Sequence, residues 1–214
     1  MEKGIERLIE IVREEGGERP LVFLDTGAVI QFENELAANE NTHLTSYWLY
    51  SSLAKKFPIY VSEHAIQEIC RHHKKHIIGR RPEISEETHS IMEKLHENYC
   101  SLLKQVKNNP RRLDEVRYDI LNAGQIAEII RSREHEKKKN KEGMSEIDRG
   151  ILGTAAFLRY AIIEGEKPIT SSIILSTDDL LIDCAHILCD RFYHIFEEFG
   201  KFGYDNIKVF DLKN

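Results

Sequence analysis

The sequence lacks several features that would indicate its class directly. It has four cysteines and no CxxC pair, so neither a zinc ribbon nor a thioredoxin-like motif is indicated. No apolar run approaches the roughly 18 residues of a membrane span, and the amino-terminal stretch has no apolar core typical of a signal peptide. The patterns GxxxxGK, GxGxxG and HExxH are also missing. These absences lead us to expect a cytoplasmic protein with reduced thiols and no membrane partner.

The bulk composition fits one folded domain. The chain has 214 residues, of which 41% are apolar and 31% charged, and this length is ample for a real core. The formal net charge is −6 and the pI is about 6.0, which is not the overall signature of a nucleic-acid-binding protein. An overall sum hides local patches, however, so a basic surface is still compatible with these values.

Short apolar runs alternate with helical patterns along the chain. This alternation predicts a parallel α/β sheet with right-handed crossovers and helices on both faces. Ile5 to Val12 recur at helical spacing before Gly16-Gly17, which predicts a helix and its stop. Residues 79–143 are charged and helical in period, and they predict a helical insertion broken near Pro110, within a single domain covering 1–214. The predicted strands are 21–25, 58–62, 171–175 and 207–212.

Acidic side chains follow these strands. Asp178 and Asp179 come directly after an apolar run, where such a pair can cap a helix or hold a metal ion. Asp25 ends the first strand, and the carboxyl ends of parallel strands meet at one edge of a sheet. Glu68 and Asp148 lie in or near helix starts that could reach the same edge. Four carboxylates repel one another unless a cation or shared protons neutralise them, and an all-oxygen site suits Mg²⁺ or Mn²⁺.

Four segments carry these acids in a recognisable order. VFLDTGAVI, VSEHAIQEI, EIDRGILGTAA and ILSTDD resemble the four acidic motifs of PIN-domain nucleases. The resemblance covers roughly residues 20–78 and 145–212. It implies a PIN-like fold and a ribonuclease that hydrolyses RNA phosphodiester bonds with Mg²⁺ or Mn²⁺. The catalytic metal ligands that it implies are Asp25, Glu68, Asp148 and Asp178.

The resemblance leaves further roles open. Family members often have a fifth acid close behind the fourth motif, and Asp179 or Asp183 could be this metal ligand. Thr26 or Thr177 could orient a carboxylate or water. A homodimer and an antitoxin-like protein partner are further alternatives, and so is a catalytically inactive PIN-type module that binds RNA or a protein. A haloacid dehalogenase-type phosphatase fits poorly, because it requires an aspartate at position 27, where this chain has Gly27.

An acidic site needs positive charge nearby to hold RNA. Two basic stretches, CRHHKKHIIGRR and KKKNK, lie next in sequence to the proposed ligand segments. Phosphate contacts of this kind add affinity without sequence readout and weaken with salt. We interpret His72, His73 and His76 as a solvated basic face or RNA contact in preference to a zinc site. The candidate RNA-binding residues are Arg71, Lys74, Lys75, Arg80, Arg81, Lys137, Lys138 and Lys139.

Each acid also has a structural alternative. Asp25 could end its strand in a turn, and Glu68 could be a solvated residue in mid-helix. Asp148 near a helix start is also what the helix dipole favours, with Ser145 as the expected N-cap. We further expect the aromatic residues between 192 and 202 to pack for the last helix.

Overall fold

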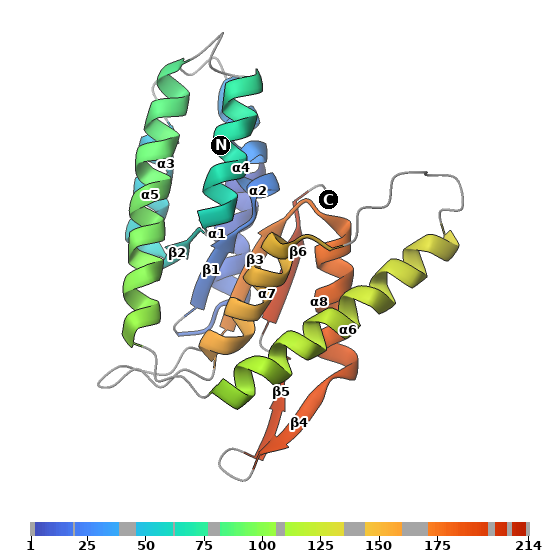
Figure 1. Ribbon diagram of the computed structural model, residues 1–214. Coiled ribbons are helices and arrows are strands. Elements are labelled where there is room, and N and C mark those ends of the chain that lie inside the picture. The colour runs from blue at the N-terminus through green and yellow to red at the C-terminus, as the bar shows by residue number, and fades with distance from the viewer. Residues whose placement is uncertain are drawn as a thin grey trace.

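A parallel sheet forms the centre of the computed structural model, which describes residues 3–18, 20–38, 46–61, 63–76, 82–105, 110–134, 144–159, 171–196, 200–204 and 207–212. In these ranges the sheet has four strands in the order β2-β1-β3-β6 (Figure 1). Every neighbouring pair runs parallel, which confirms the expected parallel α/β architecture. The strands are β1 (Pro20–Leu24), β2 (Ile59–Tyr60), β3 (Ser171–Ser176) and β6 (Ile207–Asp211).

Helices cover both faces of this sheet. Alternate side chains of β1 point to opposite faces, and Val22 and Leu24 belong to a different core from Leu21 and Phe23. Both faces are therefore buried, which explains why the strand is a continuous apolar run. The helices of the described ranges are α1 (Lys3–Glu15), α2 (Thr26–Ala38), α3 (Ser46–Lys56), α4 (Glu63–His76), α5 (Pro82–Gln105), α6 (Pro110–Glu134), α7 (Glu146–Arg159) and α8 (Asp179–Arg191).

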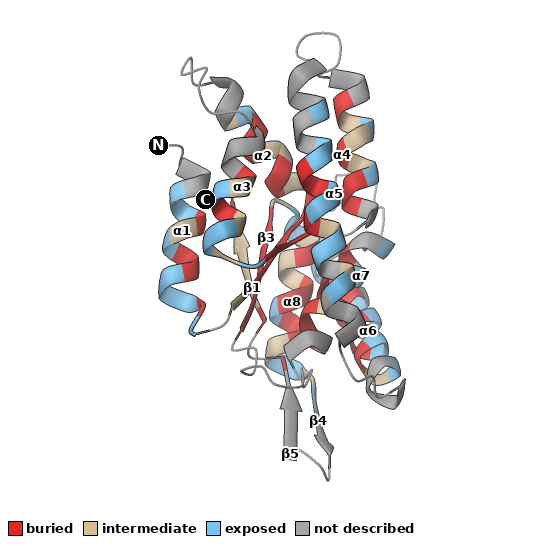
Figure 2. Cartoon of the chain, turned by 90° about the vertical axis from the view of Figure 1, so that its left-hand side faces the viewer, coloured by how far each residue is buried: buried red, intermediate tan, exposed pale blue. Residues whose placement is uncertain are grey.

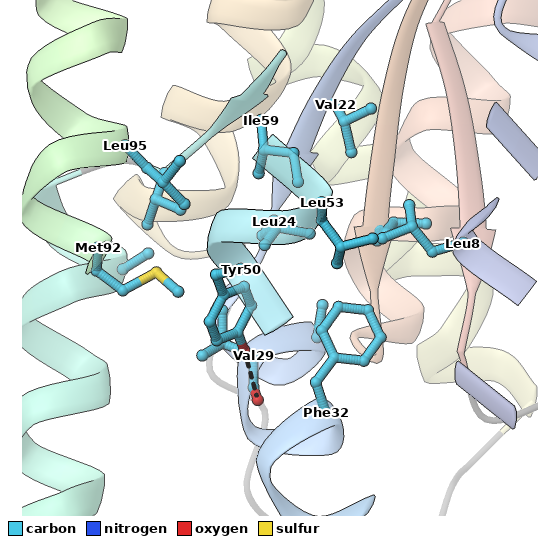
Figure 3. Close-up of a cluster of buried hydrophobic side chains, with 14 of the residues drawn as sticks. Leu8, Val22, Leu24, Val29, Phe32, Tyr50, Leu53, Ile59, Met92 and Leu95 are labelled. Carbon is cyan, nitrogen blue, oxygen red and sulfur yellow. Dashed lines mark hydrogen bonds between the residues drawn. The ribbon is translucent and has the colours of Figure 1, made fainter. Parts of the chain in front are cut away.

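Two hydrophobic cores lie on these two faces. The α5 core is built from α1 to α5 and one face of β1 and β3, whereas the α6 core is built from α6, α7, α8 and the other face. Buried residues gather along the sheet and the inner sides of the helices (Figure 2). Figure 3 shows part of the α5 core, in which the hydroxyl of Tyr50 donates to the carbonyl of Val29. Its labelled members include Leu8, Val22, Leu24, Phe32, Leu53, Met92 and Leu95.

The predicted helical insertion is divided between the two cores. It forms two helices, α5 and α6, as expected, and they run along different sides of the molecule (Figure 1). Met92 and Leu95 of α5 are buried in the α5 core, while Ile120 and Ala123 of α6 are buried in the α6 core. The segment therefore stabilises the sheet from both faces.

A two-stranded antiparallel hairpin replaces part of the expected helix packing near the end of the chain. It consists of β4 (Tyr193–Phe196) and β5 (Gly200–Gly203) and projects beyond the end of α8 (Figure 1). The expectation that the whole aromatic run packs for the last helix is wrong, because α8 ends at Arg191 and Tyr193 is 58% exposed. Aromatic residues favour strands as readily as helix packing. Phe192 packs against the α6 core as expected, and Phe199 lies outside the described residues.

Three further expectations concern membrane-spanning helices, the cysteines and the amino-terminal helix. Of the helices that it describes, none is both long and apolar enough to cross a bilayer. The four cysteines are all free thiols. The short helix expected at the amino terminus is present as α1, and Gly17 follows it with a φ of 70°.

Candidate functional site

The proposed acids lie where the order of the sheet reverses. From β1 the chain crosses to β2 on one side, and it later enters β3 on the other side. In open parallel sheets, ligands bind beyond the carboxyl ends of the strands at such a switch point. The backbone N–H of Asp25 donates to the carbonyl of Leu175 at 3.1 Å, so Asp25 stands beside the end of β3.

A chain of hydrogen bonds links three of the predicted acids across this edge. The two oxygens of the Asp25 carboxylate accept from the backbone N–H of Thr26 and from the hydroxyl of Ser176, each at 2.7 Å. The Ser176 hydroxyl also accepts from the N–H of Asp178 at 2.9 Å. On the other side, the Thr26 hydroxyl donates to Glu68 at 2.8 Å. Thr26 therefore orients two carboxylates, as the sequence suggested for a threonine here.

The fourth acid, Asp148, lies in the first turn of α7. The Ser145 hydroxyl donates to Asp148 Oδ2 at 2.7 Å and accepts from the Asp148 N–H at 3.1 Å. The N–H of Ser145 also donates to Asp148 Oδ2 at 3.2 Å, which completes a capping box with aspartate at its last position. This confirms Ser145 as the N-cap. It also buries the Asp148 side chain at the start of the helix.

The acids at this edge also act on one another electrostatically. Burial, together with the charges of Asp148 and Asp178, raises the pKa of Asp25 to about 6 against the hydrogen bond from Ser176. Burial likewise raises the pKa of Asp148, against its bond to Ser145, with added contributions from Asp178 and Glu68. Such mutual effects require short separations through a poorly solvated region. The sequence-predicted acids are thus brought to one edge of the sheet.

Asp178 also serves as the cap of α8. Its Oδ1 atom accepts from the N–H groups of Leu180 at 2.6 Å and Leu181 at 3.2 Å. The helix-cap alternative is therefore confirmed for Asp178. Because these bonds use only Oδ1 and the cap faces Asp25 and Asp148, capping is compatible with a role at the shared edge.

The two candidates for a fifth acid have another partner. Arg131 of α6 donates through Nε to Asp183 at 2.5 Å and contacts Asp179 through Nη1 at 3.5 Å. Both carboxylates are only partly buried. The structure thus accounts for Asp179 and Asp183 as an ion-pair brace between α6 and α8, and their role as metal ligands stays a prediction.

Two residues of the site escaped the sequence reasoning. Ser176 is fully buried between Asp25 and Asp178, and its only signal was a hydroxyl at the end of an apolar strand. Gly27 is the second residue of α2 and lies beside Thr177, where an added Cβ would lie 2.0 Å from the Thr177 hydroxyl and 3.5 Å from Asp25 Oδ2. Any side chain at position 27 would therefore displace Thr177 from the end of β3.

The predicted RNA-binding residues are only partly placed. Arg71 is exposed on α4, and Lys74 and Lys75 belong to the same helix. Arg80, Arg81, Lys137, Lys138 and Lys139 lie outside the described residues. The expectation of a solvated histidine face is wrong for His73, which is 1% exposed and lies 2.6 Å from Glu33.

The donor set decides which ion the edge could hold. In the ranges that the structure covers, no three histidine, cysteine, aspartate or glutamate side chains form a ready metal-binding group. The four acids at the edge nevertheless supply only carboxylate oxygens, and this chemistry fits Mg²⁺ or Mn²⁺. Comparisons of the chain with protein-family models, with curated proteins and with solved structures find no match.

Proposed function

We propose that this protein is a ribonuclease of the PIN type that uses Mg²⁺ or Mn²⁺ to hydrolyse RNA phosphodiester bonds. The observation that carries the proposal is the hydrogen-bonded chain from Glu68 through Thr26, Asp25 and Ser176 to Asp178 at the switch point. Asp148 joins it electrostatically. Repulsive acids held together by dedicated hydroxyl groups are typical of a cation site. The resemblance of the four motifs supports RNA as the substrate.

Two sets of residues would have different roles at this site. Asp25, Glu68, Asp148 and Asp178 would hold the cation, and Thr26, Ser176 and Ser145 fix the orientation of their carboxylates. When bound, a divalent cation neutralises these acids and activates water for attack on phosphorus. The burial of Asp25 makes an isolated negative charge unfavourable there, which strengthens the attraction of a positive ion.

A second candidate is a PIN-type module that binds RNA or a protein without cleaving it. It is favoured because two of the acids already have structural roles. Asp178 caps α8, and Asp148 closes a capping box at the start of α7. It also agrees with the lack of a ready metal-ligand group among the described side chains. The two candidates differ in whether a divalent ion supports cleavage.

The test is cleavage of a labelled single-stranded RNA by protein first stripped with EDTA and then supplied with Mn²⁺. We expect Asp25→Asn and Asp148→Asn each to reduce the rate at least about 100-fold, because either change removes a charged ligand. Asp190→Asn, at an exposed acid of α8, is the matched control and should cleave normally. Full activity of Asp25→Asn would overturn the site. A wild-type protein that neither cleaves nor gains thermal stability with Mn²⁺ would favour the binding module.

A further inference from the structure

A groove of about 610 Å³ lies between α6 and α7, on the side of α7 turned away from the sheet. Its lining includes two arginines, Arg117 of α6 and Arg149 of α7, with Gly150 and Gly153 along its floor. The volume is typical of a ligand site. Among the residues that the structure describes, none of those predicted from the sequence to bind RNA lines it.

The groove passes close to the acidic edge. Glu146 and Arg149 line it, and both belong to the same turn of α7 as Asp148. One helical turn rises about 5.4 Å, so the groove begins within about that distance of Asp148 along the helix. Asp148 faces inward and is buried, whereas Glu146 is exposed on the outer side. The groove therefore begins beside the turn of α7 that carries Asp148, on the outer side of that turn.

The charge of the lining suits a phosphate backbone. Guanidinium groups bind phosphate oxygens in a planar, two-pronged geometry. Arg117 contacts Asp114 at 3.6 Å, but both side chains are more than two-thirds exposed, so water and salt weaken that pair. Within the described ranges no carboxylate forms an ion pair with Arg149. The carboxylate of Glu146, which also lines the groove, repels an anion and reduces the positive charge of the lining.

Gly150 leaves the surface of α7 open where the helix lines the groove. Glycine is the poorest helix former after proline, yet Gly150 lies inside α7. An added Cβ there would meet no atom within 4 Å, so packing within the protein does not require glycine. A glycine is useful where another backbone must come close to the helix.

We infer that the groove between α6 and α7 binds the sugar–phosphate backbone of single-stranded RNA and leads it to the acidic edge. The inference rests on the proposed function in identifying this RNA as the substrate. Arg117 and Arg149 contact phosphates, and Gly150 lets the strand lie against α7. Contacts of this kind are independent of base sequence.

The first test measures RNA binding without cleavage. A fluorescein-labelled oligouridylate is titrated with protein in EDTA and followed by fluorescence anisotropy. The double variant Arg117→Ala/Arg149→Ala should bind about tenfold more weakly, and its slope of log K against log salt should fall by about 1.4, or 0.7 for each lost phosphate contact. The control Arg7→Ala/Arg13→Ala removes the same charge from exposed positions of α1 and should bind like wild type. Unchanged affinity and slope in the groove variant would overturn the inference.

A second pair of variants separates binding from folding. Gly150→Gln places a good helix former in open space, so the melting temperature should be maintained or should rise by about 2 °C. Its side chain fills the groove, so RNA affinity should fall although the fold is intact. Glu146→Gln removes the opposing charge and should tighten binding. A Gly150→Gln protein that melts normally and binds RNA normally would contradict the inference.

The two proposals can fail separately. If the groove variants lose RNA affinity while Asp25→Asn still cleaves, the groove stands and the nuclease site is wrong. If Asp25→Asn is inactive while Arg117→Ala/Arg149→Ala binds RNA like wild type, the nuclease site stands and the groove is wrong.

Discussion

Asp25 is a carboxylate in a position where ionisation is unfavourable. Burial raises its pKa from 3.8 to about 6, although Ser176 and Thr26 donate hydrogen bonds to it. Because the folded protein then holds this proton more tightly than the unfolded chain, protonated Asp25 favours the folded state below about pH 4. That contribution is lost as the pH rises through about 6. Above this pH the ionised group costs about 3 kcal/mol.

Asp25→Asn should therefore stabilise the metal-free protein at neutral pH. The amide removes the cost of ionisation and gives up one hydrogen bond of about 1 kcal/mol, so we expect the melting temperature in EDTA to rise by a few degrees near pH 7.5. Near pH 4 the carboxyl is largely protonated in the unfolded chain as well as in the folded protein, and the advantage should disappear. Thermal melts at both pH values measure this, with the exposed Asp114→Asn as control. A variant that is less stable than wild type at the higher pH would contradict the burial argument.

Arg131 connects α6 and α8, two neighbouring helices of the α6 core. It reaches from α6 to Asp179 and Asp183 on α8, close to the capped start of that helix. All three side chains are partly exposed, so each pair contributes modestly and is weakened by salt. The brace is therefore expected to position α8 more than to stabilise the whole protein.

A double-mutant cycle can show whether Asp183 braces or binds metal. Urea unfolding of Arg131→Ala, Asp183→Asn and the double variant should give a coupling free energy of about 0.5 to 1 kcal/mol. If Asp183 only braces, Asp183→Asn should keep the stabilisation that Mn²⁺ gives to wild type, whereas Asp178→Asn should lose it. Loss of the Mn²⁺ effect in Asp183→Asn would make this residue the fifth ligand.

The sequence predicted which segments form helices and strands, but it said less about which of these elements pack against one another. The apolar runs located β1, β2, β3 and β6, most clearly β1, whose burial on both faces requires a continuous apolar run. The ends of those strands then located Asp25 and Asp178. The periodicity of α5 and α6 showed that each has an inner face, but not which face of the sheet it covers. The hairpin was missed because its aromatic residues are equally typical of helix packing.

The hydroxyl groups of the site could not be predicted for a related reason. Ser176 and Asp25 are 151 residues apart in sequence, and their bond exists only because β1 and β3 are neighbours. Likewise, the need for Gly27 depends on Thr177, which reaches α2 from the end of another strand. Residue type identifies a donor or a small side chain, whereas its partner is set by the sheet order.

Taken as a whole, the molecule is a sheet held between two cores, and each core requires one helix of the 79–143 segment. Met92 of α5 is fully buried in the α5 core, and Ile120 of α6 is 2% exposed in the α6 core. Because both cores pack on the same four strands, loss of either one removes support from the strands that carry Asp25 and Asp178. We therefore expect the chain to unfold in one cooperative transition.

Truncating either core residue tests this expectation. Met92→Ala and Ile120→Ala should each lower the free energy of unfolding by about 2 to 5 kcal/mol, since both leave a cavity in a packed interior. Urea denaturation followed by circular dichroism measures the change, and the exposed positions Ser90→Ala and Gln125→Ala on the same helices serve as controls. A segment that acted only as a substrate clamp would tolerate both core truncations with little change in stability. Equal urea midpoints for wild type and Met92→Ala would therefore show that α5 is dispensable for the fold. The 79–143 segment would then be an insertion, as the sequence predicted.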